Sequence, residues 1–242
     1  MIRTRIKLIT LDLDETLWPL QPTIGDAEEA LLHWLAEHAP SLAGAHDLRS
    51  MRAHRRTLMQ ERPEIAHDVT ALRHTSLQQL LGDHGHPAAE AADLAAAAMA
   101  QFLAHRNLVR PYPDIPGALR RLARHFRLVS VTNGNADPEL TPLAGLFEHR
   151  VTAAAAGASK PDPAVFERAL ALAGCSPQES LHAGDDPVLD VAAARAIGMA
   201  AVWVNRTART WPEGLEPPDH MVTDLAQLAD WLGLPRGETN GV

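Results

Sequence analysis

The sequence predicts an α/β fold: a doubly wound parallel sheet with an all-helical cap inserted after the first strand. Short runs of branched aliphatic residues alternate with helical patterns over most of the chain, which is typical of parallel strands joined by right-handed crossovers. Residues 20–108 interrupt this alternation, because they hold helical patterns and no strand pattern. The first strand also ends in two acids, Asp12 and Asp14. Since an ionised carboxylate is costly to bury alone, a cationic group is expected to meet them.

The predicted strands are short and mostly apolar. Residues 6–13 form an almost continuous apolar run, as expected for a strand that is covered on both faces. Five later segments have the same form: residues 126–134, 149–154, 180–185, 199–205 and 220–224. Together they predict the strands of one sheet.

Helical patterns separate the strands of the core, at residues 116–125, 162–173 and 188–197. Asp162 is predicted to cap the second of these helices, with Pro163 in its first turn. Helices in these positions would cover the faces of a parallel sheet.

Residues 20–108 are predicted to form a separate helical domain. Four segments have the apolar spacing of helices: residues 24–38, 47–60, 69–81 and 88–106. Proline-rich stretches at residues 18–22 and 110–113 are interpreted as linkers on either side. We therefore predict an α/β core made of residues 1–19 and 109–242, and a helical cap made of residues 20–108.

The composition argues against several classes of protein. The chain has 242 residues and a net charge of -8, which disfavours generic nucleic-acid binding, because phosphate backbones need basic surfaces. No stretch approaches the roughly 20 apolar residues that span a bilayer. The short apolar run near the start meets two acids, unlike a signal peptide. With Cys175 as the single cysteine, no internal disulfide is available. We expect a soluble, cytoplasmic protein, a monomer or small homo-oligomer, without nucleic-acid or membrane partners.

Polar residues follow four of the predicted strands. In an open parallel sheet, ligands bind at the carboxyl ends of the strands, so these residues are expected to converge. They are Asp12 and Asp14, Thr132 and Asn133, Lys160, and Asp185, Asp186 and Asp190. Several carboxylates together with hydroxyl, amide and ammonium groups predict a site for Mg²⁺, a hard cation that prefers oxygen ligands and substrate phosphate.

Phosphoryl transfer is the chemistry that such a set of groups favours. One carboxylate can attack phosphorus and form an aspartyl-phosphate. A second carboxyl group can protonate the leaving alkoxide and later deprotonate the attacking water. The cation and a lysine can neutralise the phosphoryl oxygens in the transition state. The sequence therefore predicts an enzyme that hydrolyses a small-molecule phosphate ester.

Four segments carry these groups: DLDET (12–16), VTNGN (131–135), SKPDP (159–163) and GDDPVLD (184–190). In order and position they resemble the four motifs of the haloacid dehalogenase superfamily, and the resemblance covers the whole chain. It implies a Rossmann-like core with a helical cap and a Mg²⁺-dependent phosphatase. Phosphatases of the superfamily have the second aspartate of the first motif and its dehalogenases lack it, so Asp14 favours phosphate-ester hydrolysis.

The resemblance also implies roles for the first two acids and for Lys160. Asp12 would be the nucleophile and a metal ligand. Asp14 would be the acid and base, and would bind the metal through its backbone carbonyl. Lys160 would stabilise the nucleophile and the phosphoryl group, while Thr132 and Asn133 would bind phosphate.

Other roles stay open at this point. Asp185 would be a main metal ligand, with Asp186 and Asp190 as competing candidates for the supporting position. Trp18 could stack on a planar ring of the substrate or pack the cap against the core. Arg49, Arg52 and Arg56 form a stripe at helical spacing, which could be a solvated face, or one of these arginines could meet an anionic part of the substrate.

A narrower resemblance rests on three segments: PEIAHDVT (63–70), TNGNADPEL (132–140) and SLHAGDD (180–186). They are similar to the bacterial flavin mononucleotide phosphatase group, which also hydrolyses 5-amino-6-(5-phosphoribitylamino)uracil in riboflavin biosynthesis. This resemblance implies FMN or a ribityl phosphate as substrate. A sugar-phosphate or phosphoglycolate phosphatase is the alternative on the same scaffold. A phosphate-binding regulatory module without turnover is the alternative of another class.

Overall fold

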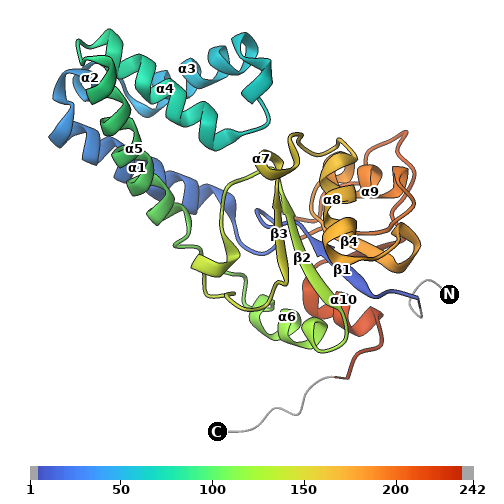
Figure 1. Cartoon of the computed structure of the whole chain (residues 1–242). Coiled ribbons are helices and arrows are strands. Elements are labelled where there is room, and N and C mark those ends of the chain that lie inside the picture. Colours follow the sequence, from blue (N-terminus) through green and yellow to red (C-terminus); the bar gives the residue numbers. More distant parts are fainter. Residues whose placement is uncertain (1–4, 236–242) are drawn as a thin grey trace, which may run out of the picture. The chain divides into compact units, whose positions relative to one another are not determined.

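The computed structural model describes residues 5–235 and contains a six-stranded sheet, in the order β3-β2-β1-β4-β5-β6 (Figure 1). All neighbouring strands pair in parallel. The strands are β1 (Leu8–Leu11), β2 (Arg127–Thr132), β3 (His149–Thr152), β4 (Ser180–Gly184), β5 (Ala200–Val204) and β6 (His220–Val222). The predicted doubly wound parallel sheet is therefore confirmed. The ends of the predicted core, residues 1–4 and 236–242, lie outside the described residues.

Strand β1 is the centre of the sheet and places the first acidic motif. It pairs with β2 on one side and β4 on the other, so that Leu11 lies opposite Ser130 and Ala183. All four of its residues are buried, which explains its continuous apolar character. Because the strands are parallel, the residues after β1, β2 and β4 emerge at the same edge of the sheet.

Helices cover both faces of the sheet (Figure 1). Helix α8 (Ala164–Ala173) packs against β2 and β3, and α9 (Ala193–Ala196) packs against β5. Helix α6 (Ile115–Ala123) packs against β2 and against α10 (Leu225–Trp231). The core on the α8 side contains Leu8, Val129, Val131, Val151, Phe166 and Trp203. Alternate residues of the same strands are buried toward the other face, because successive side chains of a strand point in opposite directions.

Three predicted elements differ in detail. Helix α8 begins at Ala164 with Pro163 rather than Asp162 in the N-cap position, although Asp162 Oδ1 accepts from the Ala164 amide (2.9 Å). The strand expected at residues 149–154 ends at Thr152, whose hydroxyl accepts a hydrogen bond from the Ala155 amide (3.1 Å) and begins the short helix α7 (Ala153–Ala156). The helix expected at residues 188–197 is a π-helical turn, η4 (Pro187–Ala192), followed by α9. Such π-helical turns are rare and occur frequently at functional sites.

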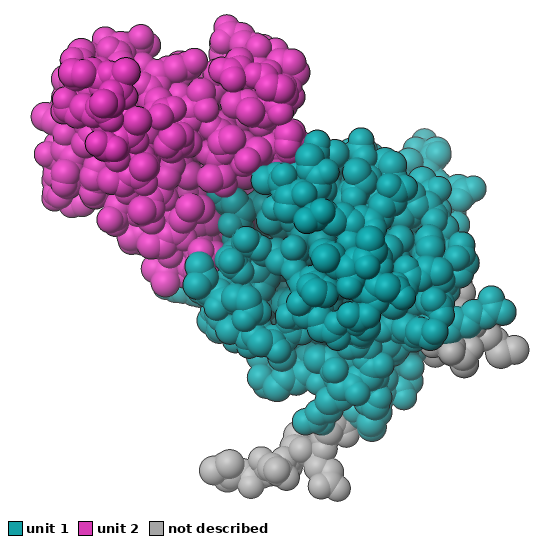
Figure 2. Space-filling view, viewed as in Figure 1, with its two compact units in different colours: residues 1–19, 110–242 teal, residues 20–109 magenta. Residues whose placement is uncertain are grey.

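The chain divides into two compact units, coloured separately in Figure 2. The first comprises residues 1–19 and 110–242, as far as these are described. The second, residues 20–109, is called the helical unit, and its residues, which are all described, form no strand. Its α-helices are α1 (Leu20–His38), α2 (Pro40–Ala45), α3 (Leu48–Glu61), α4 (Val69–Asp83) and α5 (Ala88–Arg106). None of the helices within residues 5–235 is both long and apolar enough to cross a bilayer.

The proline-rich stretch at residues 18–22 is only partly a linker, which corrects the sequence interpretation. Helix α1 begins at Leu20, so Pro22 lies in its first turn. A proline there removes no intrahelical hydrogen bond, because the first amides of a helix have no partner within it.

A buried carboxylate joins three helices of the helical unit. The Glu28 side chain on α1 is 3% exposed and forms ion pairs with Arg52, Arg55 and Arg73. Its Oε1 accepts from Arg55 Nη2 at 2.8 Å and from Arg73 Nη2 at 3.3 Å, and its Oε2 accepts from Arg52 Nε at 2.7 Å. Glu28 therefore connects α1 to α3 and α4.

Replacing Glu28 with glutamine should destabilise the helical unit by about 3 kcal/mol, because removing one partner of a buried ion pair leaves the other charges uncompensated. Urea unfolding followed by far-UV circular dichroism measures this loss. The neighbouring exposed Glu29→Gln is the matched control and should change stability by no more than about 0.5 kcal/mol. Equal effects of the two substitutions would contradict a stabilising role for the Glu28 cluster.

Stability should also depend on pH through Glu28. Burial acts to raise the pKa of this carboxyl, but Arg52, Arg55 and Arg73 outweigh it and hold the pKa below its ordinary value of 4.5. A group with a lowered folded-state pKa contributes stability above its unfolded-state pKa and loses it as the pH falls through the folded value. The stability difference between wild type and Glu28→Gln should therefore be constant near neutral pH and shrink below pH 4.5. A difference that grows on acidification would contradict this assignment.

Candidate active site

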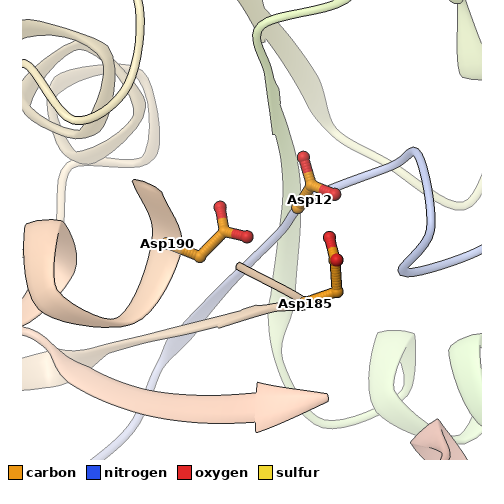
Figure 3. A group of neighbouring side chains, drawn as sticks. All are labelled: Asp12, Asp185 and Asp190. Carbon is orange, nitrogen blue, oxygen red and sulfur yellow. The ribbon is translucent and has the colours of Figure 1, made fainter. Parts of the chain in front are cut away.

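Three acids converge where β1 and β4 end (Figure 3). Asp12 follows β1, Asp185 follows β4, and Asp190 lies in η4. Each offers a carboxylate oxygen within 4.8 Å of the others, which is a spacing that could hold a metal ion. We call these three residues the acidic site. In Figure 3 their side chains point toward a common space from three different segments of the chain.

Lys160 is the cation that meets these acids. Its Nζ donates to Asp12 Oδ1 (2.7 Å), to Asp190 Oδ1 (2.6 Å) and to the Val131 carbonyl (3.1 Å), so all three ammonium hydrogens have acceptors. The residue is 4% exposed. Burial acts to lower its pKa, but the two carboxylates outweigh burial and raise the pKa above the ordinary value. Lys160 therefore stays charged.

The acidic site has fewer cations than carboxyl groups, since Lys160 contacts two of its three acids and Arg209 contacts the third. Burial raises the pKa of Asp12 to about 8, with repulsion from Asp190 and Asp14 adding to it and Lys160 opposing it. Burial and repulsion from Asp190 also raise the pKa of Asp185 to about 6. The raised pKa values show that Lys160 and Arg209 do not fully offset burial and repulsion between the acids. Hard oxygen donors at this spacing suit a divalent cation.

His182 supports Asp190 from inside strand β4. The imidazole is fully buried, with Nε2 3.1 Å from Asp190 Oδ1 and Nδ1 2.8 Å from Thr10 Oγ1. Burial lowers the pKa of His182, so the ring is neutral. Because an ionised carboxylate can only accept, the ring hydrogen lies on Nε2, which donates to Asp190, and the Thr10 hydroxyl donates to Nδ1. Lys160 and His182 together outweigh burial and hold the pKa of Asp190 below its usual range.

The structure separates the two candidates for the supporting acid. Asp186 caps η4, with Oδ1 accepting from the Val188 and Leu189 amides at 2.8 Å. Asp190 instead turns into the acidic site, and its Oδ2 accepts from the Asp186 amide (2.9 Å). Gly184 makes room for it, since a Cβ there would lie 2.3 Å from the Asp190 carboxyl group. Asp190, rather than Asp186, thus joins Asp12 and Asp185.

Asp12 and Asp14 are held by different neighbours. Asp12 Oδ2 accepts from the Thr16 hydroxyl at 3.0 Å. Asp14 Oδ1 accepts from the indole Nε1 of Trp18 at 2.8 Å. The Trp18 ring is fully buried, which favours a role in orienting Asp14 over direct stacking on a ligand.

Thr132 and Asn133, at the end of β2, make different contacts. Thr132 is buried at the end of the strand, and its hydroxyl accepts from the Gly134 amide (2.9 Å). The side chain of Asn133, expected to bind phosphate, pairs with the backbone of Lys160: Nδ2 donates to the Lys160 carbonyl (3.0 Å), and Oδ1 accepts from the Lys160 amide (2.7 Å). Asn133 thereby fixes the segment that carries the lysine.

Sequence reasoning missed several supporting residues. Arg209 Nη2 donates to Asp185 Oδ2 (2.9 Å), and Trp203 Nε1 donates to the Asp185 carbonyl (2.8 Å). Both contacts join residues that are far apart in the chain, so no local sequence pattern predicts them. His182 carried a signal, because it is a polar residue in the middle of a buried apolar strand.

Relatives in sequence share most of this chain. A family model described as haloacid dehalogenase-like hydrolase matches residues 6–198. The Escherichia coli (strain K12) 5-amino-6-(5-phospho-D-ribitylamino)uracil phosphatase YigB is 35% identical over 234 residues, covering 95% of this chain and 96% of the relative.

Solved structures with the same fold carry two kinds of name. The crystal structure of a 2-haloacid dehalogenase from Pseudomonas syringae pv. Tomato DC3000 matches with a TM-score of 0.89 and 39% identity, covering 94% of this chain and 98% of that one. A haloacid dehalogenase-type (HAD) phosphatase from Thermococcus onnurineus matches with a TM-score of 0.67 and 22% identity, covering 96% and 100%, and shares the fold. The names of these relatives thus refer to phosphatases and to a haloacid dehalogenase.

Replacing His182 should weaken cation binding at the acidic site, because Asp190 would lose the hydrogen bond that orients it. Loss of such an outer partner typically lowers metal affinity by roughly 10- to 100-fold. Mn²⁺ titration followed by calorimetry would show this drop for His182→Leu, with partial recovery in His182→Gln, whose amide can still donate. Equal affinities of wild type and His182→Leu, with unchanged circular dichroism, would contradict the orienting role.

Proposed function

The chain belongs to the haloacid dehalogenase-like hydrolases, as its four motifs predict, and we propose that it hydrolyses phosphate monoesters of small molecules. The hydrolysis uses Mg²⁺ and passes through an aspartyl-phosphate on Asp12. The observation that carries the proposal is the pair of acids after β1. Lys160 holds Asp12, the proposed nucleophile, while Trp18 holds Asp14 separately as an acid and base.

Asp14 favours a phosphatase over a dehalogenase. A halide leaves carbon as a stable anion and needs no proton, whereas the alkoxide that leaves a phosphate ester does. A second carboxyl group fixed near the nucleophile supplies this proton. The charge of the acidic site agrees, because a site with excess carboxylate suits a cation that neutralises phosphoryl oxygens.

The donor set fits Mg²⁺, since Asp12, Asp185 and Asp190 offer hard carboxylate oxygens. Asp12, Asp185 and the backbone carbonyl of Asp14 would hold the ion, with Asp190 in the supporting position. When bound, Mg²⁺ would neutralise phosphoryl oxygens and favour the ionised form of the carboxyl groups that hold it.

The chain's own residues carry the two steps. An Asp12 carboxylate oxygen attacks phosphorus, the bond from phosphorus to the ester oxygen breaks, and Asp14 donates its proton to the departing alkoxide. Asp14, now ionised, takes a proton from water, which attacks the phosphorus of the aspartyl-phosphate. This step releases inorganic phosphate and restores the Asp12 carboxylate. Lys160 and the Thr132 hydroxyl stabilise the charge on the phosphoryl group during both steps.

The substrate that we favour is a ribityl phosphate of the flavin series. The support is the similarity to a ribitylaminouracil phosphatase over 95% of the chain. The short motif at residues 63–70 in the helical unit also resembles the flavin mononucleotide phosphatase group. Such a substrate would place the protein in the cytoplasm, where small phosphorylated metabolites are made.

The chain should hydrolyse p-nitrophenyl phosphate with Mg²⁺ and lose this activity in EDTA. Asp12→Asn should lower kcat on the order of a thousandfold or more, because it removes the nucleophile. Asp93→Asn, an exposed change on α5, is the control and should leave kcat unchanged. Activity that survives EDTA would argue against the metal, and an active Asp12→Asn would argue against the mechanism. No turnover at all would favour a regulatory module.

Substrate preference can be measured as kcat/KM over a panel of compounds. We expect 5-amino-6-(5-phosphoribitylamino)uracil and FMN to rank above phosphoglycolate and hexose phosphates. We expect no halide release from 2-chloropropionate, because the groups of the site are suited to stabilising the negative charge of a phosphoryl group. A higher kcat/KM for a sugar phosphate would refute the flavin assignment, and halide release would refute the choice of phosphatase.

A further inference from the structure

A cavity of about 280 Å³ lies within the helical unit, between α3 and α4. Four arginines and three apolar side chains line it: Arg52, Arg55, Arg56, Arg73, Met59, Val69 and Leu72. All of these residues belong to the helical unit, whereas every residue of the acidic site belongs to the other unit. The cavity is therefore formed by the helical unit alone.

The cavity carries more positive than negative charge. Glu28 is the carboxylate that pairs with Arg52, Arg55 and Arg73, so three guanidinium groups share one anion. Arg56 adds a fourth guanidinium group to the lining. Protein carboxylates thus balance only part of the charge, and a bound anion would balance the rest.

Arg73 is the arginine with the least favourable surroundings. Its side chain is 8% exposed and stacks on the Phe102 ring, with the guanidinium carbon 3.7 Å from the ring centre. Its Nε has no hydrogen-bond partner among the described residues. Burial and repulsion from Arg55 lower its pKa to about 9, although Glu28 opposes them. A nearby anion would stabilise the charged form of this buried guanidinium group.

Two of the three apolar lining residues are accessible to a ligand. Met59 and Val69 are among the few large apolar side chains of the described residues that are strongly exposed, at 43% and 37%. A ligand with an anionic head and a small apolar body would cover them while its head meets the arginines.

We propose that this cavity binds a small organic phosphate as its dianion. The guanidinium groups of the α3 arginines donate hydrogen bonds to the phosphate oxygens. Met59, Val69 and Leu72 contact the carbon skeleton. Four guanidinium groups against one carboxylate match a doubly charged head better than a single carboxylate. Arg–phosphate pairs also form parallel hydrogen bonds that give geometric selectivity.

Propylphosphonate is a suitable probe, since it carries a dianionic head that no phosphatase hydrolyses. Calorimetric titration of the full chain in EDTA should show binding that Arg56→Gln weakens about tenfold or more, the typical effect of losing a charged hydrogen bond. Arg49→Gln is the matched control, because it removes the same charge from an exposed position of α3 outside the cavity lining. It should leave the affinity unchanged.

Three results would overturn the proposal. One is the absence of binding, and another is equal weakening by Arg49→Gln and Arg56→Gln, which would indicate general charge attraction. The third is tighter binding of butyrate than of propylphosphonate, which would indicate a carboxylate site. The titration involves no turnover, so its outcome is independent of whether Asp12 and its neighbours hydrolyse phosphate esters.

Discussion

The acidic site depends on the contacts of the Lys160 ammonium group. This group lies between two buried carboxylates, Asp12 and Asp190, and uses its third hydrogen on the backbone of β2. Without it, the carboxylates would face one another in a dry interior at high electrostatic cost. Even with Arg209 on Asp185, the three acids outnumber the two cations that contact them. We propose that a divalent cation and a phosphoryl group complete this arrangement together.

The fold around Lys160 fixes each of its partners. Asn133 binds the lysine backbone through both atoms of its side-chain amide, which ties the Lys160 segment to the end of β2. The π-helical turn after β4 directs Asp190 inward, and Gly184 leaves space for its carboxyl group. His182 completes the support from within the sheet. These contacts come from separate segments, so the geometry at the acidic site is a property of the folded sheet.

The sequence predicted the convergence of polar groups because parallel strands all end at one edge of a sheet. It could not decide between Asp186 and Asp190, since both lie just after β4 and a π-helical turn depends on tertiary packing. It assigned Asn133 to phosphate, while the structure shows its side chain on the Lys160 backbone. The arginine stripe of α3 is a second case in which the sequence pattern did not identify which side chains lie together. Helical spacing grouped Arg49 with Arg52 and Arg56, but only the last two line the cavity, together with Arg55.

We propose that Asp12 is a nucleophile and that Asp14 acts separately as acid and base. This proposal is tested most directly in Asp14→Asn with p-nitrophenyl phosphate, whose leaving group needs no proton. Rapid mixing should show a burst of one p-nitrophenolate per enzyme followed by slow turnover, since water is no longer activated. Mass spectrometry of the quenched protein should find phosphate on the peptide that contains Asp12. Phosphate on another residue, or steady turnover at the wild-type rate without a burst, would contradict the claim.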